Sequence, residues 1–167
     1  MDKKLRASVI TISDAAAAGR AEDLAGPVAV ELLEDGGVEV VATKIVPDDV
    51  RDISEAVQNM SYDDIDLVFT IGGTGIGPSD YTARAMDPLL RFDIPGIADA
   101  IRISDLNSGV SHAMFSRGRA GVMVNGKERT LVVNAAGPVR AVQNALSVLL
   151  PILPYAIREI RGERTQN

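Results

Sequence analysis

Two aspartates and a glycine-rich loop are the residues of this chain whose types and spacing point most clearly to chemistry. Asp48 follows one apolar, β-branched segment, and Asp80 follows another after the run Gly72-Gly73-Thr74-Gly75. Proteins commonly hold Mg²⁺ with one or two carboxylates together with the phosphates of a substrate, and the metal neutralises charge during phosphoryl-type transfer. The pattern therefore predicts a Mg²⁺ site at Asp48 and Asp80.

The glycine run is the second chemical signal. Glycines at 72–75 would let the backbone take positive φ and approach a ligand closely, with several N–H groups free to bind an anion such as phosphate. The run is not a P-loop, because Pro78 and Ser79 stand where Lys and Ser/Thr should follow, and Pro78 also replaces the third glycine of a dinucleotide fingerprint. An ordinary tight turn between a strand and a helix is the alternative.

The charged candidates also have simpler explanations. Either Asp48 or Asp49 is suited to cap the helix that follows them, and Asp80 to cap a helix of its own. Arg117 lies beside a glycine and is a candidate cation for a phosphate, or else a solvated loop charge. His112 is the single histidine and has no evident partner, so we assign it no role.

Alternating strand and helix patterns predict the elements that position these residues. Short β-branched runs indicate buried strands at 7–13, 38–46 and 67–71, and apolar residues at helical spacing indicate helices at 23–35, 50–60, 80–90 and 96–106. Segments 121–125 and 129–134 fit either a hairpin or two separate edge strands. A last helix opens with Pro138 at its first turn, is expected to break or kink at Pro151 and Pro154, and is followed by a loose tail at 162–167.

This order predicts an α/β fold, because parallel strands need crossover connections and helices supply them. We expect one domain over residues 1–167, with a sheet covered by helices on both faces. Ligands of such sheets bind beyond the carboxyl ends of the strands. The segments expected to meet at that rim are Ser13-Asp14, 47–49, 72–80 and 134–137.

Composition excludes several classes of function. The formal net charge of −6 and the pI of about 4.8 disfavour binding to nucleic acid or to an anionic membrane. The absence of cysteine removes disulfides, thiolate nucleophiles and sulfur-held metals, and a single histidine excludes a His-rich metal site. No apolar run approaches the roughly 20 residues of a membrane span. The charged N-terminus passes directly into an alternating segment without a signal sequence, so we expect a soluble, cytoplasmic protein.

Taken together, the motifs resemble the MoaB/Mog family of molybdenum cofactor proteins over nearly the whole chain. Those that carry the resemblance are Ile12-Ser13-Asp14, Pro47-Asp48, Gly72-Gly73-Thr74-Gly75, Asp80-x-Thr82, Ser116-Arg117 and Gly137-Pro138. The most specific is Thr70-Ile-Gly-Gly-Thr-Gly75 followed by Asp80-x-Thr82. The helix motif at 95–102, Pro-Gly-Ile-Ala-Asp-Ala-Ile-Arg, supports it.

The resemblance implies a three-layer sandwich with a mixed, mainly parallel sheet between helices, assembled as a homotrimer or homohexamer. It implies binding of molybdopterin and, in catalytic members, adenylylation of its phosphate with Mg²⁺ and ATP. By the same resemblance Asp48 and Asp80 are the catalytic and metal-binding residues. The substrate-binding residues implied by it are Ser13, Asp14, Gly72, Gly73, Thr74, Gly75, Thr82, Ser116, Arg117 and Gly137.

Some positions depart from the family pattern. Ala15 and Ser79 stand where basic residues are common, and Ala135-Ala136-Gly137 replaces a Leu-Pro-Gly turn. Fewer cations near a polyphosphate weaken ground-state binding. These departures motivate an alternative function, a non-catalytic oligomeric paralogue with a regulatory or protein-binding role, for which the sequence names no partner.

Overall fold

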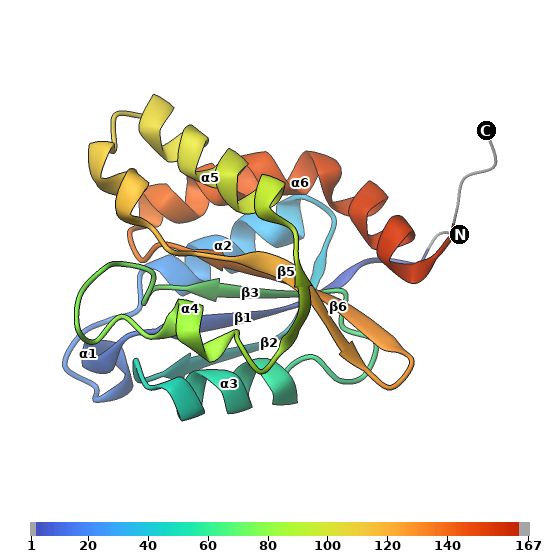
Figure 1. Cartoon of the computed structure of the whole chain (residues 1–167), viewed down its shortest axis with the longest axis horizontal. Coiled ribbons are helices and arrows are strands. Elements are labelled where there is room, and N and C mark those ends of the chain that lie inside the picture. The colour runs from blue at the N-terminus through green and yellow to red at the C-terminus, as the bar shows by residue number, and fades with distance from the viewer. Residues whose placement is uncertain (1–2, 164–167) are drawn as a thin grey trace.

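The computed structural model describes residues 3–163, and in this part of the chain a sheet lies between two layers of helices (Figure 1). Six strands form the sheet. They are β1 (Arg6–Ile12), β2 (Glu39–Val46), β3 (Leu67–Ile71), β4 (Leu90–Asp93), β5 (Ala120–Asn125) and β6 (Glu128–Ala135). The helices are α1 (Asp14–Ala17), α2 (Ala25–Asp35), α3 (Val50–Asn59), α4 (Thr82–Ala85), α5 (Pro95–Asn107), the 3-10 helix η1 (Ser111–Phe115) and α6 (Val139–Arg161).

The strands run in the order β2-β1-β3-β6-β5-β4. β2, β1, β3 and β6 are parallel to one another, whereas β5 pairs antiparallel with both β6 and β4. The sheet is therefore mixed and mainly parallel, and the predicted fold class is confirmed. β5 and β6 form the hairpin that periodicity alone could not distinguish from two separate strands.

Alternation along the buried strands divides the interior into two cores. Leu67, Phe69 and Ile71 of β3 face one core, which also contains the apolar stripes of α2, α5 and α6. Val68, between them in sequence, faces the second core with Ile53 of α3 and the residues of α4. Successive side chains of a strand point to opposite faces, so a strand buried on both sides reads as a continuous apolar run.

The segment predicted as a helix at 80–90 has a different structure. α4 is a single turn, Thr82–Ala85, and the chain then enters the edge strand β4. Pro88 explains the early end, because a proline disfavours helical conformation in the residue before it and lacks the N–H that a helix needs. The short helices α1 and η1 were also not predicted, since both are too short to show a periodic apolar pattern.

The C-terminal helix departs from expectation in two ways. Pro138 is the residue before the first helical turn, and α6 continues through Pro151 and Pro154 to Arg161 without a break. Both prolines lie on the exposed face, where water can satisfy the carbonyls that lose a partner, while Leu149 and Leu153 keep the helix on the core. Gly162 ends it with a φ of 75°. Residues 164–167 of the predicted tail lie outside the described residues.

None of the described helices is long and apolar enough to cross a membrane. The elements that matter for a ligand are the segments that leave β1, β3 and β6. Because these three strands are adjacent and parallel, their carboxyl ends open onto one edge of the sheet.

Candidate functional site

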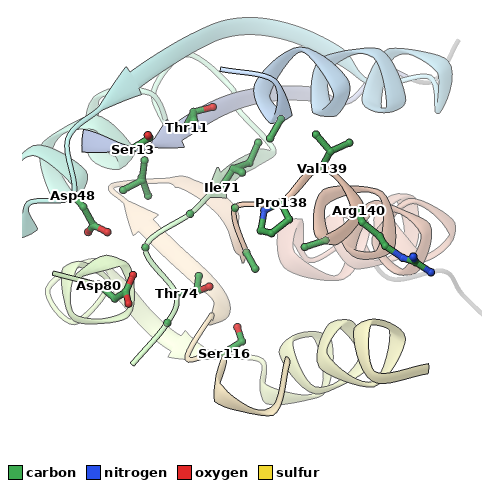
Figure 2. A pocket seen from close by; sticks show the side chains of 18 of the residues that line it. Thr11, Ser13, Asp48, Ile71, Thr74, Asp80, Ser116, Pro138, Val139 and Arg140 are labelled. Carbon is green, nitrogen blue, oxygen red and sulfur yellow. The ribbon is translucent and has the colours of Figure 1, made fainter. Parts of the chain in front are cut away.

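A cavity of about 900 Å³ lies at that edge of the sheet. Its wall is built from the segments after β1, β2, β3 and β6, together with α5, η1 and the first residues of α6. Figure 2 shows Asp48 and Asp80 on one side of it and Pro138, Val139 and Arg140, at the start of α6, on the other. Its size and its predominantly apolar wall with a few polar groups are typical of a small-molecule site.

The glycine loop passes through the middle of this cavity in a conformation that requires glycine. Gly72 and Gly73 have φ angles of 104° and 65°. A Cβ on Gly72 would lie 2.3 Å from the carbonyl oxygen of Ile12, and one on Gly73 would lie 2.3 Å from Oγ1 of Thr82 and 2.7 Å from Oδ2 of Asp48. The glycines therefore serve both the turn and the close approach of Asp48 to the loop.

Thr82 fixes the beginning of the loop. Its hydroxyl donates to the carbonyl oxygen of Gly72 at 2.8 Å, and its backbone N–H donates to that of Gly73 at 3.0 Å. The side chain is fully buried and is not part of the cavity wall. Thr82 therefore holds the loop from behind, and its contact with substrate stays a prediction.

Arg117 fixes the other end of the loop. Its Nε donates to the carbonyl oxygen of Gly75 and its Nη2 to that of Asp80, each at 2.7 Å, and its backbone N–H donates to the carbonyl oxygen of Thr74, also at 2.7 Å. The residue is not part of the cavity wall. The guanidinium of Arg117 holds the loop, and its expected contact with a phosphate stays a prediction.

The residue that caps α3 is Asp49 and not Asp48. Asp49 is the N-cap of α3, and its carboxylate accepts hydrogen bonds from the N–H groups of Arg51 and Asp52. Asp48 Oδ1 accepts a 2.9 Å hydrogen bond from the N–H of Tyr81, which brings the carboxylate to the loop after β3. Asp48 is thus left free of capping and directed into the cavity.

Asp80 does not cap a helix either. α4 begins after Tyr81 and has no side-chain cap, while Asp80 Oδ2 accepts a 2.8 Å hydrogen bond from the N–H of Gly77. A Cβ on Gly75 would lie 2.6 Å from the same oxygen. The carboxylate is therefore held against the glycine loop and belongs to the same cavity wall as Asp48.

The charge around Asp48 is uncompensated. Burial raises the pKa of Asp48, the negative charges of Asp80 and Asp14 raise it further, and only the hydrogen bond from the Tyr81 N–H opposes them. Asp14 also accepts a 2.8 Å hydrogen bond from the backbone N–H of Asp48 and lies outside the cavity wall, and its contact with substrate stays a prediction. Repulsion between paired carboxylates is what a bound cation relieves.

The remaining predicted residues lie around the cavity. Ser13, Thr74, Ser116 and Gly137 are all part of its wall. The hydroxyl of Ser13 is the N-cap of α1 and accepts a 3.2 Å hydrogen bond from the N–H of Ala16. Figure 2 shows Thr74 between Asp80 and Ser116.

The sequence did not point to five polar residues of the wall, which are Thr11, Glu22, Asp23, Asp105 and Arg140. Thr11 donates from its hydroxyl to Asp23 Oδ2 at 2.7 Å, and Asp23 Oδ1 accepts a 2.9 Å hydrogen bond from the N–H of Gly26, which closes the segment between α1 and α2 onto β1. Asp105 also belongs to the wall. Its signal was present, because it continues the buried stripe Ile97, Ile101 of α5 at a spacing of four residues.

A second arginine supports the site from outside. The guanidinium of Arg119 donates to Asp93 Oδ1 at 2.9 Å, to Asp87 Oδ1 at 2.7 Å and to the carbonyl oxygen of Ala83 at 3.0 Å. These contacts tie α4 to β4, and the bond to Arg119 lowers the pKa of Asp93. The turn that carries Asp80 is thereby braced against the edge of the sheet.

Among residues 3–163 there is no cluster of three or more histidine, cysteine, aspartate or glutamate side chains suited to a metal ion. The acidic groups of the glycine-loop end of the cavity are the carboxylates of Asp48 and Asp80. Such a pair fits Mg²⁺ that completes its octahedron with water and substrate phosphates rather than with an all-protein cage.

The fold is that of an α/β sandwich protein with a cavity of small-molecule size at the carboxyl ends of its parallel strands. A family model described as a probable molybdopterin binding domain matches residues 8–155. Molybdenum cofactor biosynthesis protein B of Bacillus subtilis is 31% identical over 163 residues, which cover 96% of this chain and 92% of that protein. The chain belongs to the MoaB/Mog family of molybdenum cofactor biosynthesis proteins.

Two further relatives show the range of this family. A crystal structure of a molybdopterin biosynthesis protein from Mycobacterium abscessus matches with a TM-score of 0.87 and 38% identity, covering 95% of this chain and 97% of that one. Gephyrin from Dictyostelium discoideum is 33% identical over 93% of this chain, but the match covers only 22% of gephyrin. The chain likewise spans less than half the length of two bifunctional relatives.

Proposed function

We propose that this protein transfers the adenylyl group of ATP to the phosphate of molybdopterin, with Mg²⁺ held at Asp48 and Asp80. An oxygen of the molybdopterin phosphate attacks the α-phosphorus of ATP. The bond from that phosphorus to the oxygen bridging to the β-phosphate breaks, its electron pair leaves with pyrophosphate, and a new phosphoanhydride joins the pterin phosphate to AMP. No proton must move between phosphate groups that are already ionised, so positioning and charge neutralisation carry the catalysis.

The observation that carries this proposal is the convergence of two uncapped carboxylates on one glycine loop. Asp48 and Asp80 both lie against the loop at 72–75, and burial, together with the charge of Asp80, raises the pKa of Asp48. An aspartate pair retained only for structure would be expected to cap helices or pair with cations. Neither occurs here, because Asp49 caps α3 and neither carboxylate forms an ion pair within residues 3–163.

The residues present fit Mg²⁺ on their donor chemistry. Asp48 and Asp80 would hold it, each with oxygen lone pairs left over after the bonds to Tyr81 and Gly77. When bound, the ion supplies positive charge for the triphosphate. This matters more here because the guanidinium of Arg117 is engaged with the backbone carbonyls of Gly75 and Asp80.

The other groups of the cavity have binding roles in this proposal. The backbone N–H groups of the loop at 72–75 cradle phosphate oxygens, and Thr74 adds a hydroxyl. Ser13, Ser116 and Gly137 bound the space in which the two substrates meet. Asp14, Thr82 and Arg117 keep the carboxylates and the loop in place, so we assign them positioning roles.

The test is an assay of purified protein with molybdopterin, ATP and Mg²⁺, in which adenylylated molybdopterin and pyrophosphate are the products. Asp80→Ala should lose most of the rate, because one metal ligand and the hydrogen bond to Gly77 are removed. Absence of product, when a catalytic family member forms it under the same conditions, would overturn the enzymatic proposal. Capture of a cellular protein without either ligand would then favour the non-catalytic paralogue.

We further propose that the chain acts as one domain in a cytoplasmic homotrimer or homohexamer, as membership of the family implies. Exposed apolar side chains on the edge strand β2, Val41 and Ile45, offer surface for self-association. Light scattering after gel filtration should give a mass of three or six times 17.7 kDa, and a monomer would contradict this.

A further inference from the structure

A buried carboxylate of α5 in the cavity wall has no role in the adenylyl transfer as proposed so far. Asp105 of α5 is 4% exposed and is part of the cavity wall. Figure 2 shows the start of α6, marked by Pro138 and Val139, across the cavity from Asp48 and Asp80. An aspartate is rarely buried without a partner, so its environment indicates what it is built to bind.

Asp105 is held rigidly from one side. Asn144 of α6 donates from Nδ2 to Asp105 Oδ1 at 2.7 Å and to Ser108 Oγ at 2.8 Å, which uses both of its amide hydrogens. Ser108 in turn donates from its hydroxyl to the carbonyl oxygen of Asp105 at 2.9 Å. The network fixes the orientation of the carboxylate before any ligand arrives.

The second oxygen of Asp105 is left for a ligand. Within residues 3–163, Oδ2 accepts no hydrogen bond, and Asp105 forms no ion pair. Within the described residues, the fully buried side-chain oxygen or nitrogen without a hydrogen-bond partner is Ser8 Oγ. Asp105 Oδ2 also has no partner, so it is not fully buried and can be reached from the cavity. A partly satisfied carboxylate on a cavity wall is an acceptor for N–H donors of a bound molecule.

The surfaces beside Asp105 suit a flat ring. Val110, Ala113 and Phe115 contribute apolar groups to the cavity wall, and so do Pro138 and Val139 before and at the start of α6. A carboxylate in a predominantly apolar wall favours a heterocycle that presents two adjacent N–H donors at its edge. The 2-amino-4-oxopyrimidine ring does so through its ring N–H and its exocyclic amino group, whereas adenine places an acceptor nitrogen beside its amino group.

We propose that Asp105 determines specificity by accepting both hydrogen bonds from the 2-amino-4-oxopyrimidine edge of the pterin, with Oδ2 and the remaining lone pair of Oδ1. The assignment rests on the proposed function in taking a pterin as the substrate. It places the pterin ring in the cavity beside Asp105 and its phosphate toward the glycine loop. Adenine, lacking the donor pair, is directed away from this end.

The first experiment needs no variant. Fluorescence titration of the wild-type protein compares pterin with lumazine, in which an oxo group replaces the 2-amino group and places an acceptor beside the ring N–H in place of the second donor. Pterin should bind roughly tenfold or more tightly, since a site built to pair with a donor rejects an analogue that lacks it. Equal affinities, or no binding of pterin, would overturn the proposal.

The second experiment replaces the acceptor. Asp105→Asn keeps an oxygen for Asn144 but turns an amide N–H₂ toward the ligand, so the preference for pterin over lumazine should fall to about twofold or less while ATP affinity is unchanged. A preserved preference would overturn the proposal, and so would an equal loss of ATP affinity, which indicates general damage. Thermal unfolding checks that the variant is folded, and the wild-type comparison stands if it is not.

Two controls separate the possible explanations. Guanosine has the same donor pair on a purine, and an affinity equal to that of pterin would overturn the assignment to a pterin. Failure of adenylyl transfer would remove the proposed enzymatic function but would leave the pterin and lumazine affinities to decide the role of Asp105. If adenylyl transfer is observed but Asp105→Asn prefers pterin over lumazine as strongly as the wild type does, the proposed function stands and the specificity role of Asp105 is refuted.

Discussion

The guanidinium of Arg117 donates a 2.7 Å hydrogen bond to the backbone carbonyl oxygen of Asp80, so an arginine 37 residues away sets the position of a candidate catalytic carboxylate. A second bond from the same side chain reaches Gly75. Arg117 thus joins the two ends of the loop that carries Asp80. A guanidinium suits this task because its N–H groups are fixed in one plane.

Removal of Arg117 should therefore affect catalysis more than stability. Arg117→Ala is expected to lower the rate of adenylyl transfer by about 100-fold, since small misplacements of catalytic groups have such effects, while the free energy of unfolding falls by only about 1 kcal/mol. Steady-state kinetics and denaturant unfolding measure the two. Arg129→Ala, at an exposed position on β6, is the matched control and should change neither. A large loss of stability with a proportional loss of rate would contradict the positioning role.

Two glycine-to-alanine variants test whether the loop must lie as close to Thr82 and Asp48 as the structure shows. Gly73→Ala adds a Cβ at a φ of 65°, 2.3 Å from Thr82 Oγ1, whereas Gly126→Ala adds one at a φ of 61° with no atom within 4 Å. Both variants should lose about 1 kcal/mol to the left-handed conformation. Gly73→Ala should lose several kcal/mol in total and its activity. Similar unfolding midpoints for the two variants would mean that the loop can move away from Asp48 and Thr82.

The raised pKa of Asp48 predicts a gain in stability when its charge is removed. The pKa of Asp48 is higher in the folded state than in the unfolded state, so ionisation of this carboxyl lowers the free energy of unfolding. The loss is absent below pH 3.8, the unfolded pKa, and grows as pH rises through the raised folded pKa. Asp48→Asn should therefore be more stable than the wild type at pH 7, by about 0.5 kcal/mol or less because solvent screens a partly exposed group. Thermal unfolding from pH 3 to 8 measures the difference, which should vanish at the acid end. A variant less stable than the wild type at pH 7 would contradict this.

Arg119 predicts the opposite dependence on pH. The pKa of Asp93 is lowered by Arg119, so this pair contributes stability above the unfolded value of 3.8 and loses it as pH falls through the lowered folded pKa. Arg119→Ala should cost about 1–2 kcal/mol at pH 7, a figure that already allows for solvent screening of Asp93. The cost should shrink in acid to the part supplied by the bond to the Ala83 carbonyl. A cost independent of pH would show that the ion pair contributes nothing.

Much of the fold could be predicted from periodicity, and the failures have specific physical causes. β3 was predicted with its observed bounds, because a strand buried on both faces is an uninterrupted apolar run between polar turns. The segment after Asp80 was predicted wrongly, since its apolar residues suit a helix while Pro88 and pairing with β5 make it a turn and an edge strand. Tertiary pairing of this kind has no local signal.

The sequence indicated which residues gather at the candidate site, but not which of them face the cavity and which hold the loop in place. Asp48, Asp80 and the glycine loop lie in one cavity wall, as their positions after strands indicated. The sequence could not distinguish residues that face the cavity from residues that hold it, because Arg117 forms its bonds to Gly75 and Asp80 with backbone oxygens, which carry no residue signature. Asp105 was missed for a related reason, since a carboxylate on a buried stripe is informative only once its partner on α6 is known.

In the proposed function Asp48 organises Mg²⁺ and ATP, and it does not cap the helix beside it. The most direct measurement is the rate of formation of adenylylated molybdopterin, with Mg²⁺ and ATP, by Asp48→Asn and by Asp49→Asn. Asparagine at 49 can still cap α3, so that variant should retain nearly the wild-type rate, whereas Asp48→Asn should lose about 100-fold or more because the amide removes a charged metal ligand. Equal rates for the two variants, or a wild-type rate in Asp48→Asn, would contradict the account.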